Sequence, residues 1–266
     1  MGIATAAVLI LGNRPVPFSR RREAAFAGAG FALALHFATW IASLRFTSVA
    51  VSTLLVTTTP IWTEAFDAVR ERRAPARTYV LALVCAIGGV CAIAFSKASQ
   101  PAPVAGHALF GDVLALCGSF AIGAYLLVVR DAGKNDAGRL PTGAIVVRTY
   151  AWAALFLALA AALAGEGPPP LSDTRAWAGI VAMALVSQLL GHTALNAALR
   201  DFTPSIVAFS TLLEPLAAAL LAAITFHEFL GPATIAGGVL VLGAVAVALA
   251  FSGRAKTEAL SAEVLS

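Results

Sequence analysis

Apolar residues fill most of the chain in runs of about twenty, and short polar breaks separate these runs. About 20 residues of helix cross the hydrocarbon core of a bilayer. Backbone N–H and C=O groups in lipid need partners within the protein, which favours helices for such runs. We expect eight full spans, at Ala24–Leu44, Thr47–Ala68, Thr78–Ser96, Leu109–Val129, Thr142–Ala164, Ala176–Ala198, Ser205–Thr225 and Ala233–Phe251.

The stretch Met1–Gly12 is apolar but shorter than these spans. It lacks the basic region and the small-residue cleavage site of a signal peptide. We therefore expect it to be half of a membrane-spanning helix.

The composition agrees with a membrane protein. Hydrophobic residues make up 59% of the chain and charged residues 12%, whereas soluble domains have roughly 45–50% and about 25%. The predicted fold class is an all-α integral membrane protein, with the lipid bilayer as its surroundings. The net charge of +4 would also suit a nucleic-acid partner. However, the cations cluster between apolar runs, so we attribute them to membrane topology and expect no nucleic acid.

The distribution of lysine and arginine predicts the orientation, because these residues concentrate in cytoplasmic segments. If the loop Asn13–Glu23 is cytoplasmic and the chain alternates sides, the outer segments hold only Arg45, Lys97 and Arg175. The polar tail, residues 252–266, is then cytoplasmic, and its composition leads us to expect disorder. The inner segments hold fourteen cations: Arg14, Arg20, Arg21, Arg22, Arg70, Arg72, Arg73, Arg77, Arg130, Lys134, Arg139, Arg200, Arg254 and Lys256.

The chain contains an internal repeat. The segment Val49–Leu55 recurs as Val207–Leu213 with six identities in seven positions. The flanking residues keep the same offset of 155–158 positions, which is difficult to attribute to chance. They pair His36 with His192, Trp40 with Asn196, Pro60 with Pro215 and Gly88 with Gly243.

The two copies are predicted to be inverted, since Ala24–Leu44 runs outward and its counterpart Ala176–Ala198 runs inward. We take residues 1–96 as the first repeat and 109–251 as the second. Inverted repeats place a solute site near the midplane of the bilayer, where they meet. This arrangement favours a transporter.

Several segments of the chain form a recognisable pattern. They are ALHFATWIASLRFTSVAVSTL with Pro60, Gly111-Asp112, NAALRDFTPSIVAFSTLLEP, Glu228 within FHEFL, and GGVLVLGAV. These segments resemble the EamA half-repeat of the drug/metabolite transporter superfamily, and the resemblance extends to Phe251. It implies two inverted five-helix repeats with ten spans, and a bacterial inner-membrane protein that exports amino acids, related metabolites or drugs.

The chain departs from that family pattern in two places. The first of the ten helices is absent and the second is the half-span Met1–Gly12. An in-frame upstream extension of about 25 apolar residues would account for this difference. In addition, Arg70–Arg73 stands where a small-residue loop ending in glutamate is usual.

Polar residues within the spans are the candidate substrate-binding residues, because polar groups at membrane depth usually face the interior of the bundle. Gln188, His192 and Asn196 recur every four residues and form a stripe roughly 12 Å long. It is interpreted as a cavity wall, or alternatively as a set of interhelical hydrogen bonds. His36 and Trp40 are the corresponding pair in the first repeat, although tryptophan also anchors membrane interfaces.

Thr57 and Ser210, beside and within the repeated block, complete the expected substrate-binding set. The hydroxyls of Thr57–Thr59 could instead satisfy carbonyls that Pro60 leaves free. Pro60 and Pro215 are expected to be flexible points at which their helices bend during conformational change.

Glu214 is the most deeply placed acid of the chain. It is interpreted as a protonatable coupling residue or a partner for a substrate ammonium, and alternatively as a hydrogen-bonded carboxyl beside Pro215. Arg148 either extends to the cytoplasmic interface or pairs with a substrate carboxylate. Glu64 and Asp67 lie near the cytoplasmic end of their span and are expected to reach water.

The leading prediction is a secondary transporter that exports small amphipathic metabolites such as amino acids by alternating access, as a monomer or homodimer and with possible proton coupling. A membrane-embedded enzyme and a non-transporting structural protein are the alternatives. We expect no metal and no cofactor, because the three cysteines form no CxxC pair. The run His227-Glu228 also lacks the second histidine of HExxH, since position 231 is glycine.

The topology can be tested by labelling cysteines introduced at Ser19, Ser99 and Ser261. The cations place Ser19 and Ser261 in the cytoplasm, so labelling there should require permeabilised cells, whereas labelling at Ser99 should not. Ready labelling at Ser261 from outside would overturn the orientation.

Overall fold

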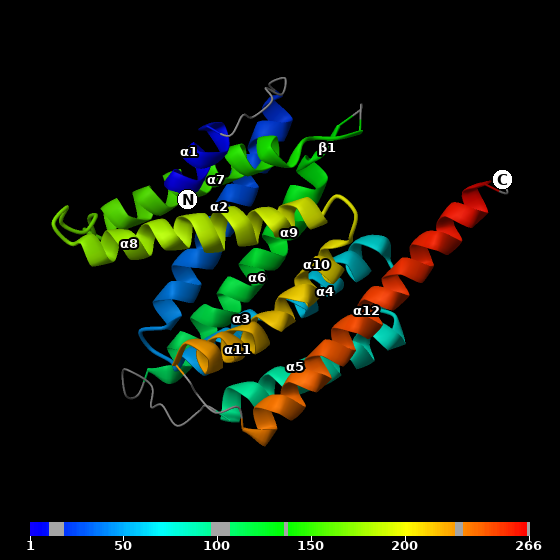
Figure 1. Cartoon of the computed structure of the whole chain (residues 1–266). Coiled ribbons are helices and arrows are strands. Elements are labelled where there is room, and N and C mark those ends of the chain that lie inside the picture. Colours follow the sequence, from blue (N-terminus) through cyan, green and yellow to red (C-terminus); the bar gives the residue numbers. More distant parts are fainter. Residues whose placement is uncertain (11–18, 97–106, 136–137, 227–230, 265–266) are drawn as a thin grey trace. The chain divides into compact units, whose positions relative to one another are not determined.

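The computed structural model describes residues 1–10, 19–96, 107–135, 138–226 and 231–264 (Figure 1). These residues are helical apart from loops and one short antiparallel hairpin, β1 (Lys134–Asn135) with β2 (Gly138–Arg139). The helices are α1 (Gly2–Ile10), α2 (Arg20–Ser43), α3 (Val49–Val56), α4 (Thr59–Glu71), α5 (Arg77–Ser96), α6 (Ala108–Ala132), α7 (Thr142–Leu163), α8 (Thr174–Ala182), η1 (Met183–His192), α9 (Thr193–Ala198), α10 (Pro204–Ser210), η2 (Thr211–Leu213), α11 (Glu214–Phe226) and α12 (Pro232–Val264).

Seven helical segments of the described chain are long and apolar enough to cross a membrane. They correspond to α2, α5, α6, α7, the continuous run α8–η1–α9, the run from α10 into α11, and α12. The predicted all-α membrane fold is therefore confirmed. The predicted span Thr47–Ala68 is not among the seven, because it is divided into α3 and α4.

The break between α3 and α4 follows from Pro60. Proline has no N–H, so it cannot donate to the carbonyl four residues earlier, that of Val56. The hydroxyl of Thr59 donates to this carbonyl instead, at 2.9 Å. The hydroxyls of Thr57 and Thr58 donate to the carbonyls of Leu54 and Leu55, at 3.0 and 2.6 Å. Threonine side chains thus replace backbone donors around the break.

The second copy of the repeated block also ends in an interruption before a proline. The helix α10 ends at Ser210, and the 3₁₀ turn η2 follows before α11 begins. Pro215 cannot donate to the carbonyl of Thr211. The backbone N–H of Glu214 donates to it instead, and this bond closes the tight turn.

A π-helix of ten residues, η1 (Met183–His192), lies within the run from α8 to α9. Hydrogen bonds of the i→i+5 type are rare in proteins and occur frequently at functional sites. Two residues of the predicted polar stripe, Gln188 and His192, belong to this π-helix. The sequence pattern does not predict this π-helix.

The chain divides into two compact units. Unit 1 comprises Met1–Ala38 and Ala124–Asp201, and unit 2 comprises Thr39–Gly123 and Phe202–Ser266. Each unit therefore combines segments from both predicted repeats. Within unit 1, α1 packs against α7, and within unit 2, α5 packs against α12 and α4 against α10.

Glycines allow α5 and α12 to approach closely inside unit 2. A Cβ atom on Gly89 would lie 2.6 Å from the carbonyl oxygen of Gly237, and one on Gly237 would lie 2.5 Å from that of Gly89. Gly89 also neighbours Val241, whereas Gly237 neighbours Ile93, so the two helices run antiparallel. The surrounding core comprises Ala82, Ala86, Val90, Ile93, Ile206, Phe209, Leu212, Ala219, Val241, Ala244, Val245 and Ala248.

The predicted disorder of the tail is wrong for residues 252–264, since α12 continues to Val264. After Gly253 this segment contains mostly alanine, glutamate, leucine and lysine, which have high helix propensity. Glu228, part of the family resemblance, lies outside the described residues.

Replacing Gly89 tests the contact between α5 and α12. Gly89→Ala should destabilise the protein by about 1–3 kcal/mol, because the added methyl group collides with the Gly237 backbone. The neighbouring Gly88→Ala is the matched control, since a Cβ there meets nothing within 4 Å. Thermal unfolding in detergent measures both variants. Equal stability of the two would show that the close approach is incorrect.

Candidate functional site

Two histidines face one another inside unit 1. His36 comes from α2 and is buried, and His192 is the last residue of η1. Their ring centroids are 6.4 Å apart. The ring of Phe37 lies 4.8 Å from that of His36 and 5.2 Å from that of His192. The pair that the internal repeat predicts as counterparts therefore lies together.

Asn196 forms a closed hydrogen-bond network with neighbouring helices. It is only 1% exposed. Its Oδ1 and Nδ2 atoms lie 2.9 and 2.7 Å from the hydroxyl of Tyr125 on α6. Nδ2 also donates to the His192 carbonyl at 2.8 Å and lies 3.5 Å from the hydroxyl of Tyr150 on α7. Interhelical hydrogen bonding, the alternative interpretation of the stripe, accounts for this residue.

The pattern of polar residues within the spans does not single out Tyr125 and Tyr150. Both are fully buried. A buried tyrosine hydroxyl usually has a hydrogen-bond partner, so two tyrosines within apolar runs were a usable signal. The Tyr150 hydroxyl lies 3.3 Å from the Gln188 carbonyl and 3.4 Å from the Thr193 hydroxyl.

Gln188 and His192 differ from Asn196 in that each has a side-chain nitrogen without a hydrogen-bond partner in the described part of the chain. Gln188 is 5% exposed, and its Nε2 atom is shielded from solvent without a hydrogen-bond partner among the residues that the structure describes. The same holds for Nδ1 of His192. A buried polar atom without a partner costs about 1–3 kcal/mol. These two atoms are therefore open hydrogen-bonding positions.

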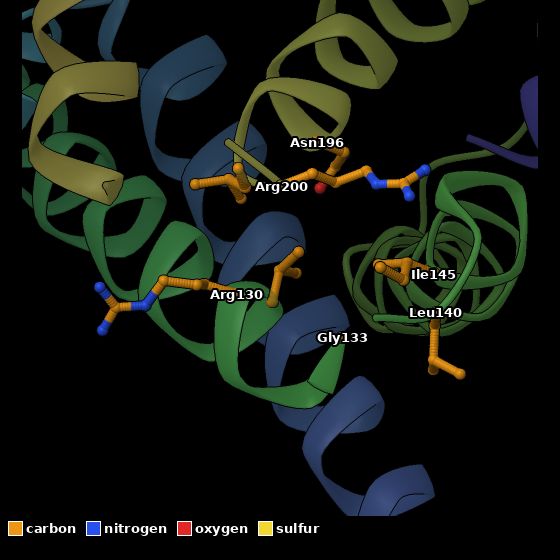
Figure 2. Close-up of a pocket in the computed structure, with 8 residues that line it drawn as sticks. Arg130, Gly133, Leu140, Ile145, Asn196 and Arg200 are labelled. Carbon is orange, nitrogen blue, oxygen red and sulfur yellow. The ribbon is translucent and has the colours of Figure 1, made fainter. Parts of the chain in front are cut away.

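A small pocket with a cavity volume of about 10 Å³, partly open to the outside, lies at the other end of the stripe (Figure 2). The Arg130 guanidinium points away from that of Arg200 in Figure 2, so the two do not form a clamp for one anion. Arg130 Nε lies 3.4 Å from an Asp131 carboxylate oxygen. The pocket is lined by Val129, Arg130, Gly133, Leu140, Ile145, Asn196, Leu199 and Arg200.

Arg148 has an ionic partner within unit 1. Its Nη1 atom lies 3.4 Å from a carboxylate oxygen of Glu23, and its guanidinium carbon lies 5.7 Å from the centre of the Phe26 ring. The other Glu23 oxygen accepts a hydrogen bond from Nε1 of Trp152 at 2.8 Å. Glu23 thus supplies a negative charge opposite Arg148 within the protein. The sequence instead predicts that Arg148 extends to the cytoplasmic interface or pairs with a substrate carboxylate.

Trp40, Thr57 and Ser210 belong to unit 2, whereas His36 and the polar stripe belong to unit 1. Trp40 is half-buried. The hydroxyl of Thr57 donates to the Leu54 carbonyl, and that of Ser210 donates to the Val207 carbonyl at 2.7 Å. Both hydroxyls thus serve their own helices. The carbonyl that Pro60 leaves free, that of Val56, accepts from Thr59 and not from Thr57.

Glu214 begins α11 and is exposed. No hydrogen bond to its carboxylate occurs within the described part of the chain. The interpretation of Glu214 as a carboxyl hydrogen-bonded beside Pro215 therefore gains no support, and its role in coupling remains a prediction. Pro60 and Pro215 are both buried.

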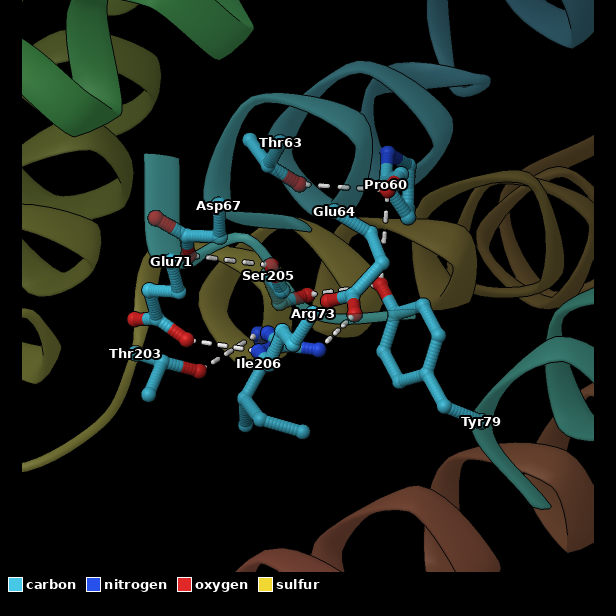
Figure 3. A network of polar contacts seen from close by, with 10 residues as sticks. All are labelled: Pro60, Thr63, Glu64, Asp67, Glu71, Arg73, Tyr79, Thr203, Ser205 and Ile206. Atoms are coloured by element: carbon cyan, nitrogen blue, oxygen red, sulfur yellow. Dashed lines mark hydrogen bonds and ion pairs between the residues drawn. The ribbon is translucent and has the colours of Figure 1, made fainter. Parts of the chain in front are cut away.

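The expectation that Glu64 and Asp67 reach water is wrong, since their exposed fractions are 7% and 2%. The helix α4 ends at Arg72 in the left-handed conformation (φ 52°), and Arg73 then extends back toward Glu64. The Nη1 atom of Arg73 lies 2.7 Å from Oε1 of Glu64, and the Nε atom of Arg73 lies 2.6 Å from Oε2 of Glu71 (Figure 3).

The hydrogen bonds to Glu64 and then Glu71 raise the pKa of Arg73 above its ordinary value, so this residue remains a cation. The Ser205 hydroxyl of α10 lies 3.4 Å from Asp67 Oδ2. The Tyr79 hydroxyl lies 3.4 Å from both the Ser205 carbonyl and the Pro60 carbonyl. Figure 3 shows how these contacts join α4, α5 and α10 within unit 2.

The described residues contain no group of three or more histidine, cysteine, aspartate or glutamate side chains arranged to hold a metal ion.

Comparison with known families identifies the chain. Residues 109–250 match the sequence model of the EamA-like transporter family, and this match covers more than half of the chain. The chain belongs to the EamA-like transporter family. A solved crystal structure has a similar fold, with a TM-score of 0.73 over 95% of this chain and 84% of its own, at 18% sequence identity. No curated protein matches the sequence.

Membership of the EamA-like transporter family confirms the resemblance drawn from the sequence and assigns the chain to a family of multi-pass membrane transporters. The matched residues are almost those of the second predicted repeat, and the first repeat is linked to them by the internal similarity. The departure at Arg70–Arg73 from the expected EamA-like pattern has a structural explanation. Arg73 supplies the counter-ion for the buried Glu64.

Removing Arg73 should destabilise unit 2. Arg73→Gln leaves the largely buried Glu64 carboxylate without its cation, and we expect a loss of about 1–3 kcal/mol. The matched control is Arg72→Gln, because Arg72 is exposed. Thermal unfolding in detergent measures the effect, and adding Glu64→Gln to Arg73→Gln should recover most of it. Similar losses in Arg72→Gln and Arg73→Gln would contradict the role of Arg73.

Proposed function

We propose that this EamA-like transporter is a secondary transporter that exports small amphipathic metabolites by alternating access, with amino acids as the first candidates. The observation that carries the proposal is the meeting of His36 with His192, whose ring centroids are 6.4 Å apart. Corresponding residues of two inverted repeats can meet only near the pseudo-twofold axis that relates the repeats. Transporters with this symmetry bind their solutes near that axis.

Other pairs of corresponding helices support the inverted repeat. The helix α1 packs against α7 in unit 1, and α5 packs against α12 in unit 2. Each pair occupies the same position in the two predicted repeats. The antiparallel course of α5 and α12 is the course that two inverted copies require.

The orientation and location belong to the same proposal. Fourteen cations on one side against three on the other support a cytoplasmic C-terminus. We propose that the protein resides in a bacterial inner membrane, as a monomer or homodimer.

Transport is favoured over catalysis by the pairing of the buried acids. Glu64 contacts Arg73, and Asp67 contacts the Ser205 hydroxyl. An intramembrane hydrolase or transferase would need acids, metal ligands or a nucleophile and base that are available to a substrate. These contacts instead support a structural role for both carboxylates.

Flux measurements in proteoliposomes test the proposed function. Counterflow with a library of amino acids and related metabolites should detect movement of at least one solute. His36→Phe and His192→Phe should each reduce this flux at least tenfold, because they remove the polar ring nitrogens and keep an aromatic ring. His107→Phe is the matched control, since His107 is exposed and lies immediately before α6. Absence of flux for every solute would contradict the proposal.

Glu214 is proposed as the residue that couples transport to protons. Glu214→Gln keeps the size of the side chain but removes its titration. It should abolish accumulation driven by a pH gradient and leave downhill flux largely intact, whereas Glu166→Gln, at an exposed acid, should change neither. Full accumulation by Glu214→Gln would show that this acid does not couple transport.

A further inference from the structure

We propose that Gln188 and His192 form a subsite for an uncharged polar group of the solute, of the type carried by a primary amide. Such a group accepts one hydrogen bond and donates another. This inference rests on the proposed function and deepens it, because it names the chemical class that the binding site selects.

The first support is the position of the unsatisfied atoms. Nε2 of Gln188 and Nδ1 of His192 are shielded from solvent, and each lacks a hydrogen-bond partner in the described part of the chain. They lie four residues apart in the same π-helix, η1. Within a bilayer no bulk water can satisfy such atoms. A ligand that brings an acceptor to Gln188 and a complementary group to His192 would satisfy both.

The second support is the contrast with Asn196. It carries the same carboxamide group as Gln188 and belongs to the same polar stripe. Tyr125, Tyr150 and the His192 carbonyl surround that carboxamide at hydrogen-bond distance. Helix packing therefore can satisfy an amide on this stripe, and it does so for Asn196 but not for Gln188 or His192.

The third support is that the described contacts of Gln188 and His192 include no side chain with a formal charge. Among the described residues, Gln188 has a hydrogen bond from Tyr150 to its carbonyl, and His192 has the His36 and Phe37 rings and a hydrogen bond from Asn196 to its carbonyl. A carboxylate or an ammonium at membrane depth needs an opposite charge. Arg148, a cation of the same unit, has its counter-ion in Glu23.

The geometry therefore assigns three features to the preferred group. The Gln188 amide donates to an oxygen of the solute, and Nδ1 of His192 exchanges a hydrogen bond with an adjacent N–H or oxygen. The rings of Phe37 and His36 lie beside the His192 ring, with centroids 5.2 and 6.4 Å from it. A primary amide fits all three features without bringing a charge. Arg130 and Arg200 line the pocket with Asn196, and neither Gln188 nor His192 is among its lining residues.

Binding to matched ligands tests this assignment. The purified chain in lipid nanodiscs is titrated by calorimetry with two sets of compounds that differ in one group. One set is nicotinamide, nicotinate and 3-picolylamine, and the other is glutamine, glutamate and ornithine. The amide of at least one set should bind at least tenfold more tightly than its acid and its amine.

Variants identify the residues responsible. Gln188→Met keeps the size of the side chain but removes its hydrogen bonds, and should weaken binding of the amide at least tenfold. His192→Asn, which retains a polar group near the Nδ1 position, should bind more tightly than His192→Leu. Met183→Leu is the matched control in the same π-helix, because Met183 is apolar and exposed, and it should leave binding unchanged.

Gln188→Glu provides a second arm if Gln188→Met does not fold. It replaces a donor with an anion and should shift the preference from the amide to the amine of the same set. The inference is overturned if no amide binds, if the acid or amine binds as tightly as the amide, or if Gln188→Met leaves amide binding unchanged.

These results separate the inference from the proposed function. Flux of a charged solute that is unaffected by Gln188→Met would preserve the transporter and overturn the subsite. Amide binding that depends on Gln188, in a protein that moves no solute, would preserve the subsite and overturn transport.

Discussion

A polar group inside a bilayer has no water to bind, so each N–H, carbonyl and side-chain amide must find its partner within the protein. Much of this structure is a response to that constraint. Long helices satisfy the backbone, and where prolines remove a donor, Thr59 and the N–H of Glu214 take its place. Tyr125 and Tyr150 contact the amide of Asn196, and Arg73 compensates Glu64.

Because of this constraint, two buried polar atoms that lack a hydrogen-bond partner among the described residues indicate a candidate binding position, and they are Nε2 of Gln188 and Nδ1 of His192. Gln188 and His192 lie in a π-helix, and the His192 ring lies beside the His36 ring. The amide of Asn196, on the same stripe, has hydrogen-bond partners. The same stripe therefore contains one residue whose amide is satisfied by neighbouring helices, and two residues that each have a side-chain nitrogen without a hydrogen-bond partner among the described residues. Hydrophobic periodicity cannot separate these roles, because it predicts only that all three residues face inward.

The membrane spans were predictable because a run of about twenty apolar residues is a strong signal. The predicted span Thr142–Ala164 differs by one residue from the observed helix Thr142–Leu163. The internal repeat also predicted that His36 and His192 correspond, and the two rings lie close together. These features follow from the apolar runs and the internal repeat, both of which can be recognised from the sequence alone.

The remaining features depend on local competition or on contacts between distant segments. The division of Thr47–Ala68 into two helices reflects threonine hydroxyls and Pro60 acting on particular carbonyls. Burial of Glu64 depends on the left-handed conformation of Arg72, which turns Arg73 back toward the acid. The π-helix at Met183–His192 has no known signature in the pattern of apolar residues, and it alters the surroundings of Gln188 and His192.

In this structure, corresponding segments of the two predicted repeats meet at His36 and His192. Cross-linking in native membranes can test this contact, with the three cysteines Cys85, Cys91 and Cys117 replaced by alanine. His36→Cys with His192→Cys should be joined by a bifunctional thiol reagent whose reach matches the 6.4 Å between the rings, as detected by peptide mass spectrometry. The control, Leu35→Cys with His192→Cys, should not be joined, because Leu35 is exposed. A cross-link in the control pair, with none between positions 36 and 192, would show that the two segments do not meet at His36 and His192.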